Sequence, residues 1–415
     1  MAVEYQELIS SIKKECLNQI SESELYECQR NEASLRKKVE LILNGYLKSS
    51  RALYVSSEER RILLAHIVSD LLGLGPIERL LHDPEVSEIM VNGPHQVYVE
   101  KRGKLELTTV TFKDEEHLVY FIEKILSPLG RRVTEADPYI DARLKDGSRV
   151  NVVSYPVSLI GTILTIRKFS QQLLTMDDLI KGGSISKEAA DFLAACVKVK
   201  ANIILSGCSG AGKTTMLDIL SHFISPDERV ITIEDTAELQ LKGRHILRLE
   251  TRPSSIEGKG EIAIRDLIKN ALHMRPDRII VGEVRSSEVF DMLSAMTTGH
   301  EGSMATMHAN SSLEALDRLE MLTLMGNANI SPVVARRQII SAVDILVHIV
   351  RLTDGFRKVV QISELNKSNK TEFELQDIFY ADDNYMSDLR CQGRMPLLYQ
   401  KLKSHAGYRH QAFEK

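Results

Sequence analysis

The chain has 415 residues, of which 43% are apolar, 27% charged and 5% aromatic, so it is long enough for two or three folded domains. Its 53 basic and 57 acidic residues give a formal charge of −4, which excludes a general electrostatic attraction to nucleic acid or to anionic membranes. This composition also excludes a disulfide-rich mini-protein and a disordered or fibrous chain.

The cysteines and the apolar stretches bear on the cellular compartment. The five cysteines contain no CxxC pair, which argues against a zinc knuckle and a disulfide framework and favours a reducing, cytosolic compartment: Cys16, Cys28, Cys196, Cys208 and Cys391. The N-terminus is too acidic and polar for a secretory signal, and the longest uncharged stretch, Val150 to Ile166, is interrupted by Asn, Pro and Gly. We therefore expect no membrane span, which does not exclude docking on a membrane protein.

Residues 1–75 are predicted to form a short helical module, because apolar residues recur there at helical spacing. The series comprises Leu35, Val39, Leu41, Ile42, Tyr46, Ile62, Leu63, Ile67, Leu71 and Leu72. The basic residues of LRKKVE and EERRIL are interpreted as a solvated face, with a binding patch as the alternative. GLGPIE then marks the end of the module.

Residues 76–170 are predicted to form a compact α+β domain. The apolar period changes to two in VYVEKRG, KLELTTVTF, YIDARL and SRVNVV, which indicates short strands. Gly103 and the Asp146–Gly147 pair suit hairpin turns between them. One helix is expected around Glu116 to Leu126, and antiparallel strands are expected beside it.

Residues 171–185 are interpreted as a linker and hinge, and residues 186–415 as an α/β domain. Short apolar strands alternate there with helices, which predicts a parallel sheet with helices on both faces. The expected elements are NIILSG, Lys213–Phe223, RVITIE, HILRLE, Ile262–Met274, RIIVGE, Ser286–Thr298, SMATMHA and Leu313–Met325. A hairpin at Asp354–Gly355 is expected to add antiparallel strands.

The sharpest motif is GCSGAGKT, Gly207 to Thr214, which matches G-x4-G-K-[ST] between a strand and a helix. Glycines let backbone N–H groups surround a phosphate, and the N-terminus of the next helix adds positive charge. Lys213 would neutralise the β- and γ-phosphates of ATP, and the Thr214 hydroxyl would ligate Mg²⁺. The predicted nucleotide-binding residues of this motif are Gly207, Cys208, Ser209, Gly210, Ala211, Gly212, Lys213, Thr214 and Thr215.

Polar side chains end three further predicted strands: Glu234 with Asp235, Glu283, and His308. The carboxyl ends of parallel strands share one crevice, so we expect these groups to converge on the phosphate. Glu283 is the candidate general base that orients water, and Glu234 and Glu283 are candidates for contacting Mg²⁺ through water. The alternatives are a helix cap or plain loop carboxylates for Glu234 and Asp235, and a core histidine for His308.

Arginines are expected near the γ-phosphate, because a guanidinium stabilises charge during phosphoryl transfer. Arg143, Arg149 and Arg167 lie on or beside predicted strands of the 76–170 domain. The alternative for them is pairing with local carboxylates such as Asp141 and Asp146. Arg285 could instead act from within the α/β domain.

Several of these segments, in this order, carry a family resemblance. They are the phosphate motif, TIEDTAELQL, RLETRPSSIEGKGE, HMRPDRIIVGEVR and TGHEGSMATMHANS, preceded by LGLGPIERLLHDPEVSEIMVNGPHQVYVEKRGKLE, DARLKDGSRVNVV and LTIRKF. Over about residues 65–365 the chain resembles the CpaF and tight-adherence (Flp) pilus branch of the type II/IV secretion ATPase superfamily. The ending QGRMPLLYQKLKSHAG is also similar to that branch.

The resemblance implies a hexameric RecA-like P-loop NTPase domain, preceded by a PAS-like domain, that drives pilus assembly or secretion at the cytoplasmic face of the inner membrane. It assigns Glu234 and Asp235 to the acidic box, Glu283 to an unusual Walker B motif, and His308 to the histidine box. Arg149 and Arg167, with Arg143 less well matched, correspond to family arginines that reach the phosphates. The implied partners are identical subunits of a homohexamer and an inner-membrane platform protein, which would hold the protein peripherally at that membrane.

The sequence departs from the branch at several positions. Cys208 and Ala211 stand where Gly and Ser are common, Ser286–Ser287 replace a Gly pair, and TTGH replaces NTGH. A zinc-binding tetracysteine insertion is missing, which favours the CpaF and conjugation-type branches over general secretion pathway and pilus-extension ATPases. We interpret Cys208 as a small buried filler, with an oxidation-sensitive thiol as the alternative.

The leading hypothesis is therefore an ATP-hydrolysing motor in which MgATP binds between the two domains and the N-terminal domain swings about the linker. The alternative is a nucleic-acid-translocating RecA-like ATPase, which the net charge and the few aromatic residues disfavour but which the Arg131–Arg132 and Arg336–Arg337 clusters leave open. A third reading is a regulatory protein that binds ATP without useful turnover. The acidic and histidine segments argue against it.

Overall fold

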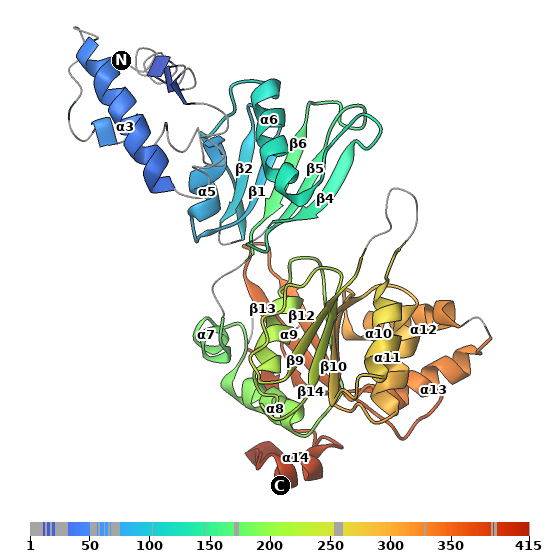
Figure 1. Ribbon diagram of the computed structural model, residues 1–415. Coiled ribbons are helices and arrows are strands. Elements are labelled where there is room, and N and C mark those ends of the chain that lie inside the picture. The colour runs from blue at the N-terminus through green and yellow to red at the C-terminus, as the bar shows by residue number, and fades with distance from the viewer. Residues whose placement is uncertain are drawn as a thin grey trace. The chain divides into compact units, whose positions relative to one another are not determined.

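The computed structural model describes residues 11–12, 15–16, 19–20, 32–49, 56, 59–61, 63–64, 67, 75–101, 103–144, 146–169, 174–252, 260–327, 329–382, 385 and 388–414. The chain divides into two compact units, Met1–Ser170 and Gln171–Lys415 (Figure 1). Across these described segments, no helix combines the length and apolar character needed to span a membrane.

The first unit is built around an antiparallel sheet of six strands in the order β3-β2-β1-β6-β5-β4. Its elements are α3 (Glu32–Ser49), η1 (Gly75–Ile77), α5 (Glu78–His82), β1 (Val86–Asn92), β2 (Val97–Lys101), β3 (Lys104–Leu107), α6 (Glu115–Leu126), η2 (Ser127–Leu129), β4 (Tyr139–Arg143), β5 (Arg149–Val153) and β6 (Ile163–Arg167). Helix α6 covers one face, where Phe121 and Ile122 pack against the alternate strand residues Val150, Val152 and Leu164. The residues between them along each strand lie on the other face of the sheet.

The expected hairpins at Gly103 and at Asp146–Gly147 join β2 to β3 and β4 to β5. The strand expected to run on to Phe112 is shorter, since β3 ends at Leu107. Thr108 turns back onto β2, because its backbone N–H and its hydroxyl both donate to the Val97 carbonyl, at 2.9 and 2.8 Å. Phe112 is then buried against Phe121 rather than paired in the sheet.

The second unit contains a sheet of nine strands in the order β15-β14-β13-β12-β7-β11-β10-β8-β9. Its elements are α7 (Met176–Lys181), α8 (Lys187–Lys198), β7 (Ile203–Gly207), α9 (Lys213–Ser221), β8 (Val230–Glu234), β9 (Ile246–Glu250), α10 (Ile264–Leu272), β10 (Arg278–Val284), α11 (Glu288–Thr297), β11 (Met304–His308), α12 (Ser312–Gly326), α13 (Pro332–Ala342), β12 (Ile345–Arg351), β13 (Arg357–Leu365), β14 (Leu375–Tyr380), β15 (Arg390–Cys391), α14 (Tyr399–His405) and η3 (Gln411–Phe413).

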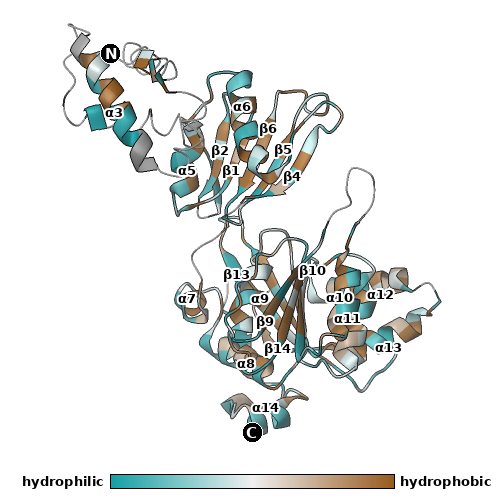
Figure 2. Cartoon of the chain, in the orientation of Figure 1, coloured by the Kyte–Doolittle hydropathy of each residue, from teal (hydrophilic) through white to brown (hydrophobic). Residues whose placement is uncertain are grey.

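Six neighbouring strands of this sheet, from β12 to β9, are parallel, and β13 to β15 extend it antiparallel. The central strands are largely apolar, as Figure 2 shows. Their alternate residues pack into two separate cores, because helices cover both faces of the sheet. Ile203 and Leu205 pack towards α8 and α9, whereas Ile204 packs towards α11 and α12. The predicted α/β fold and the Asp354–Gly355 hairpin are confirmed.

The stretch interpreted as a linker, residues 171–185, contains helix α7, which Thr175 caps in a capping box with Asp178. Met176 and Ile185 are buried in the core of the second unit, so the described part of this stretch packs as part of that unit. The sequence signal for this packing is a set of apolar residues, which a free linker would lack: Met176, Leu179, Ile180 and Ile185.

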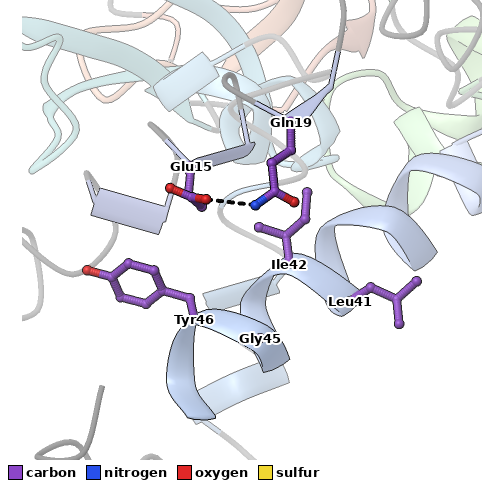
Figure 3. Close-up of a pocket in the computed structure, with 6 residues that line it drawn as sticks. All are labelled: Glu15, Gln19, Leu41, Ile42, Gly45 and Tyr46. Carbon is purple, nitrogen blue, oxygen red and sulfur yellow. Dashed lines mark hydrogen bonds between the residues drawn. The ribbon is translucent and has the colours of Figure 1, made fainter. Parts of the chain in front are cut away.

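The predicted N-terminal helical module includes α3, in which Val39, Leu43 and Leu47 are buried at i, i+4 spacing. Leu41 was expected on the same face but is 73% exposed, because a residue two positions from Val39 lies on the far side of the helix. It lines a surface pocket with Glu15, Gln19, Ile42, Gly45 and Tyr46, where the Gln19 amide donates to Glu15 at 2.7 Å (Figure 3). Cys28, Ile62, Leu71 and Leu72 lie outside the described residues.

Candidate functional site

The motif Gly207–Thr214, called the phosphate loop below, connects the end of β7 to the start of α9. Gly207 lies so close to β12 that a Cβ there would be 2.3 Å from the Ile349 carbonyl oxygen. Gly210 and Gly212 have φ values of 70° and 94°, which side chains disfavour. The loop therefore turns tightly and delivers its backbone to the N-terminus of α9, as a phosphate site requires.

Lys213 occupies the first position of α9 and is only 8% exposed. Its ammonium group donates to the carbonyl oxygens of Gly207 and Cys208, at 3.0 Å each. The positive charge of Lys213 is thus held within the phosphate loop, beside the positively polarised N-terminus of α9. Both features favour an anion at this position.

The predicted strand-end residues lie at one edge of the sheet, because the strands that carry them are parallel neighbours. β11 pairs with β7 in a register that places His308 beside Gly207. β10, with Glu283, lies next to β11, and β8, with Glu234, lies next to β10. His308 is partly exposed rather than a buried core histidine.

Glu234 is buried within the sheet edge, with 3% exposure. One carboxylate oxygen, Oε1, accepts hydrogen bonds from the backbone N–H groups of Glu238 and Leu239, both at 2.9 Å, and these residues belong to a loop and not to the helix that a helix cap would require. The other oxygen, Oε2, is buried and has no hydrogen-bond partner among the residues that the structure describes. Burial raises the pKa of this carboxyl, and the two backbone bonds oppose the shift.

Glu283 and Asp235 are joined by Arg285. The Arg285 guanidinium binds the Glu283 carboxylate, with its Nε 2.9 Å from Oε2, and lies 3.6 Å from the Asp235 carboxylate. Glu283 is partly exposed, and a Cβ on the preceding Gly282 would lie 3.0 Å from Glu234 Cγ. The two acidic strand ends are therefore adjacent, and Arg285 belongs to the same group.

The residues at this edge fit a hard divalent cation. Thr214 lies in the first turn of α9, which follows β7, and Oε2 of Glu234 is a carboxylate oxygen without a hydrogen-bond partner among the described residues, at the end of β8 in the same sheet. Mg²⁺ prefers oxygen ligands and is commonly held by one or two side chains together with substrate phosphates. Hydroxyl and carboxylate oxygens are the donors present.

The arginines Arg143, Arg149 and Arg167 belong to the first unit, where they lie side by side at the same end of three strands. Arg143 pairs with Arg149 across β4 and β5, and Arg149 pairs with Arg167 across β5 and β6. Alternation along β5 and β6 places them on the face away from α6. The carboxylates Asp141 and Asp146 accept hydrogen bonds from Asn151 and Ser148.

Two further arginines contact the phosphate loop and were not predicted. Arg351 and Arg357 face each other across the β12–β13 hairpin. Arg357 Nε donates to the Gly210 carbonyl at 2.9 Å, and a Cβ on Gly210 would lie 3.0 Å from an Arg351 nitrogen. The available signal was the basic flanks of the Asp354–Gly355 turn, but only the pairing of β12 with β7 brings them to the loop.

Cys208 is exposed, so its interpretation as a buried filler was wrong. It sits at the bend of the phosphate loop, where its thiol donates to the Asn310 side-chain oxygen at 3.2 Å. Asn310 follows His308 by two residues and is held in turn by Glu314 of α12. The loop and the segment after β11 are therefore in direct contact.

A family model described as "Type II/IV secretion system protein" matches residues 70–388. The chain is 33% identical over 326 residues to a putative conjugal transfer protein of Mycobacterium tuberculosis, which covers 77% of this chain and 92% of that protein. It is 28% identical over 330 residues to the type IV secretion system protein VirB11 of Brucella suis, covering 73% of this chain and 91% of that protein. The X-ray structure of the ATPase DotB of Yersinia pseudotuberculosis matches with a TM-score of 0.51 at 18% identity, over 71% of this chain and 78% of that one, which shows a shared fold.

Proposed function

The chain belongs to the type II/IV secretion system protein family, and on that premise we propose that it is an ATP-hydrolysing motor for pilus assembly or secretion. The observation that carries the proposal is the single sheet edge at which the phosphate loop, His308, Glu283 and Glu234 end four neighbouring parallel strands. Crevices at the carboxyl ends of such strands are where α/β proteins bind nucleotides.

The chemistry follows from the groups present. Lys213 exchanges the carbonyls of Gly207 and Cys208 for phosphate oxygens, and the backbone N–H groups of the loop complete the cradle. Glu283 orients the attacking water, while Arg285 holds its carboxylate in place. Thr214 and Glu234 would hold Mg²⁺, which neutralises charge on the phosphates when bound.

We further propose the finer assignments that the sequence resemblance implies. The protein belongs to the CpaF and tight-adherence branch, works as a homohexamer with Mg²⁺, and acts at the cytoplasmic face of the inner membrane through a platform protein. The row of Arg143, Arg149 and Arg167 supplies positive charge to the phosphates from the first unit. The segments that support this placement run from LGLGPIE to TGHEGSMATMHANS.

The test is steady-state ATP hydrolysis by the purified protein and two variants. Lys213→Ala should abolish turnover, and Glu283→Gln should bind MgATP but hydrolyse it about 10²- to 10⁴-fold more slowly. Lys187→Ala, which changes an exposed lysine of the same unit, serves as the control. Wild-type hydrolysis by Lys213→Ala would refute the assignment, and strong stimulation by single-stranded DNA would favour the nucleic-acid motor instead.

The branch assignment needs a cellular readout. Replacing Lys213 by Ala in the source cells should remove assembled surface pili while leaving the protein level unchanged. Loss of DNA transfer with intact pili would place the protein in a conjugation branch.

A further inference from the structure

A buried histidine beneath the phosphate loop has no role in the chemistry described above. His348 lies on β12, is 3% exposed, and interrupts the apolar run from Ile345 to Val350. Its register partner on β7 is Ser206, the residue immediately before Gly207. The imidazole therefore lies directly under the start of the loop.

Two neighbouring groups interact with the ring. The Ser206 hydroxyl lies 2.9 Å from Nδ1, within the protein interior. The Asn310 backbone also interacts with the ring and favours its protonated form, as a carbonyl oxygen that accepts from a ring N–H does. A neutral imidazole has one acceptor and one donor nitrogen, and this pair of partners uses both.

These contacts connect three segments that are far apart in the sequence. Ser206 precedes the phosphate loop, His348 belongs to the strand that ends at Arg351, and Asn310 follows His308 by two residues. The contact between Cys208 and the Asn310 side chain, at the surface, also connects the phosphate loop to the segment after His308. A shift of the phosphate loop relative to that segment would have to break these contacts.

On the basis of the proposed ATPase function, we propose that His348 is a positioning residue for nucleotide turnover. Through Ser206 and Asn310 it sets the spacing between the phosphate loop and the segment that carries His308. Displacement of a reacting group by about 1 Å can cost roughly 10²-fold in rate, so a contact of this kind can matter without touching the substrate.

The charge state of the ring agrees with this role. Burial lowers the pKa of His348 to about 4, and Lys213 of α9 acts in the same direction, whereas the Asn310 bond and Glu314 of α12 oppose it. The ring is therefore neutral at physiological pH, which preserves its acceptor for Ser206. Protonation would also place a second positive charge near Lys213.

The experiment compares His348→Phe, His348→Gln and Ser206→Ala with Leu346→Ala, a control that removes buried apolar volume from the same strand. His348→Phe should lower kcat about tenfold or more, with a change in KM for ATP below about threefold, and His348→Gln should restore most of the rate. Ser206→Ala should give an intermediate loss of kcat. If His348→Phe does not fold, the kcat of Ser206→Ala tests the role of His348 instead.

A second readout does not depend on catalysis. Alkylation of Cys208 by iodoacetamide, located by peptide mass spectrometry, should be at least about twofold faster in His348→Phe than in the wild type, because the Asn310 segment is released. Failure of the wild type to hydrolyse ATP would overturn the proposed function, yet this rate would still test the coupling. Unchanged kcat and alkylation in His348→Phe, or equal changes in Leu346→Ala, would overturn the role of His348.

Discussion

The two sheets arrange charged side chains in different ways. In the second unit, parallel strands end at one edge and bring the phosphate loop, two acids and a histidine to that edge from separate strands. In the first unit, antiparallel register lines up three arginines across β4, β5 and β6. A parallel edge thus yields a chemically mixed site, whereas an antiparallel row yields a concentration of one charge.

That difference has an energetic side. Like charges directly opposite one another destabilise a sheet. A bound anion would therefore stabilise the part of the sheet that carries the row of arginines. The mixed edge of the second unit already neutralises part of its charge internally, as in the pairing of Arg285 with Glu283 and Asp235. The following predictions test whether the arginine row serves function more than stability.

The largest effect is expected from the arginine row. On the role proposed for the row, Arg149→Gln should lower kcat for ATP by about 10³-fold, because a guanidinium that acts on the transferred phosphoryl group is worth that much in related chemistry. The melting temperature should stay unchanged or rise, since a like-charge neighbour is removed. Arg131→Ala, at an exposed arginine of the same unit, is the control for kcat. A melting temperature that falls while kcat is retained would make the row a structural feature.

A smaller effect is expected at the β12–β13 hairpin. Arg357→Ala removes the bond to the Gly210 carbonyl and one charge beside the phosphate loop. The expected result is a rise of about tenfold in KM for ATP with a smaller change in kcat, because a bond to the loop backbone affects ground state and transition state alike. Arg394→Ala, at an exposed arginine of the same unit, should match the wild type, and a larger loss in kcat than in KM would contradict this role.

The smallest effect concerns stability. Burial raises the pKa of Glu234, so the folded state binds its proton more tightly than the unfolded state, and ionisation costs stability above the folded pKa. Glu234→Gln should therefore raise the melting temperature at neutral pH by about 2–4 °C, the shift that about 1 kcal/mol gives in a unit of this size. The gain should shrink as the pH falls through the folded pKa, as calorimetry at several pH values would show. A gain independent of pH would mean that the charge of Glu234 is not its cause.

The sequence predicted much of the second unit because its signals are local. Alternating apolar strands and helices, together with the spacing of the phosphate loop, suffice to place Glu234, Glu283 and His308 at one sheet edge, and the α/β fold is confirmed. The membership in the type II/IV secretion family is also confirmed, while the CpaF branch and the PAS-like character of the first unit stay predictions. The catalytic role of each site residue likewise stays a prediction.

Other features depend on contacts that no local pattern encodes. Arg357 and Gly210 are separated by 147 positions, and Ser206 and His348 by 142, so only strand pairing brings them together. The exposure of Cys208 depends on the direction of a bend within the loop. Helices α8 and α13 were not predicted, although both bury one face in the cores of the second unit.

The most direct test of the site is a crystal structure of the protein with Mg²⁺ and a non-hydrolysable ATP analogue. We expect the triphosphate on the phosphate loop, Lys213 on its β- and γ-phosphates, and Glu283 within hydrogen-bond reach of the γ-phosphate directly or through one water. A nucleotide bound elsewhere, or a Glu283 carboxylate remote from the γ-phosphate, would contradict the assignment of this sheet edge as the ATPase site.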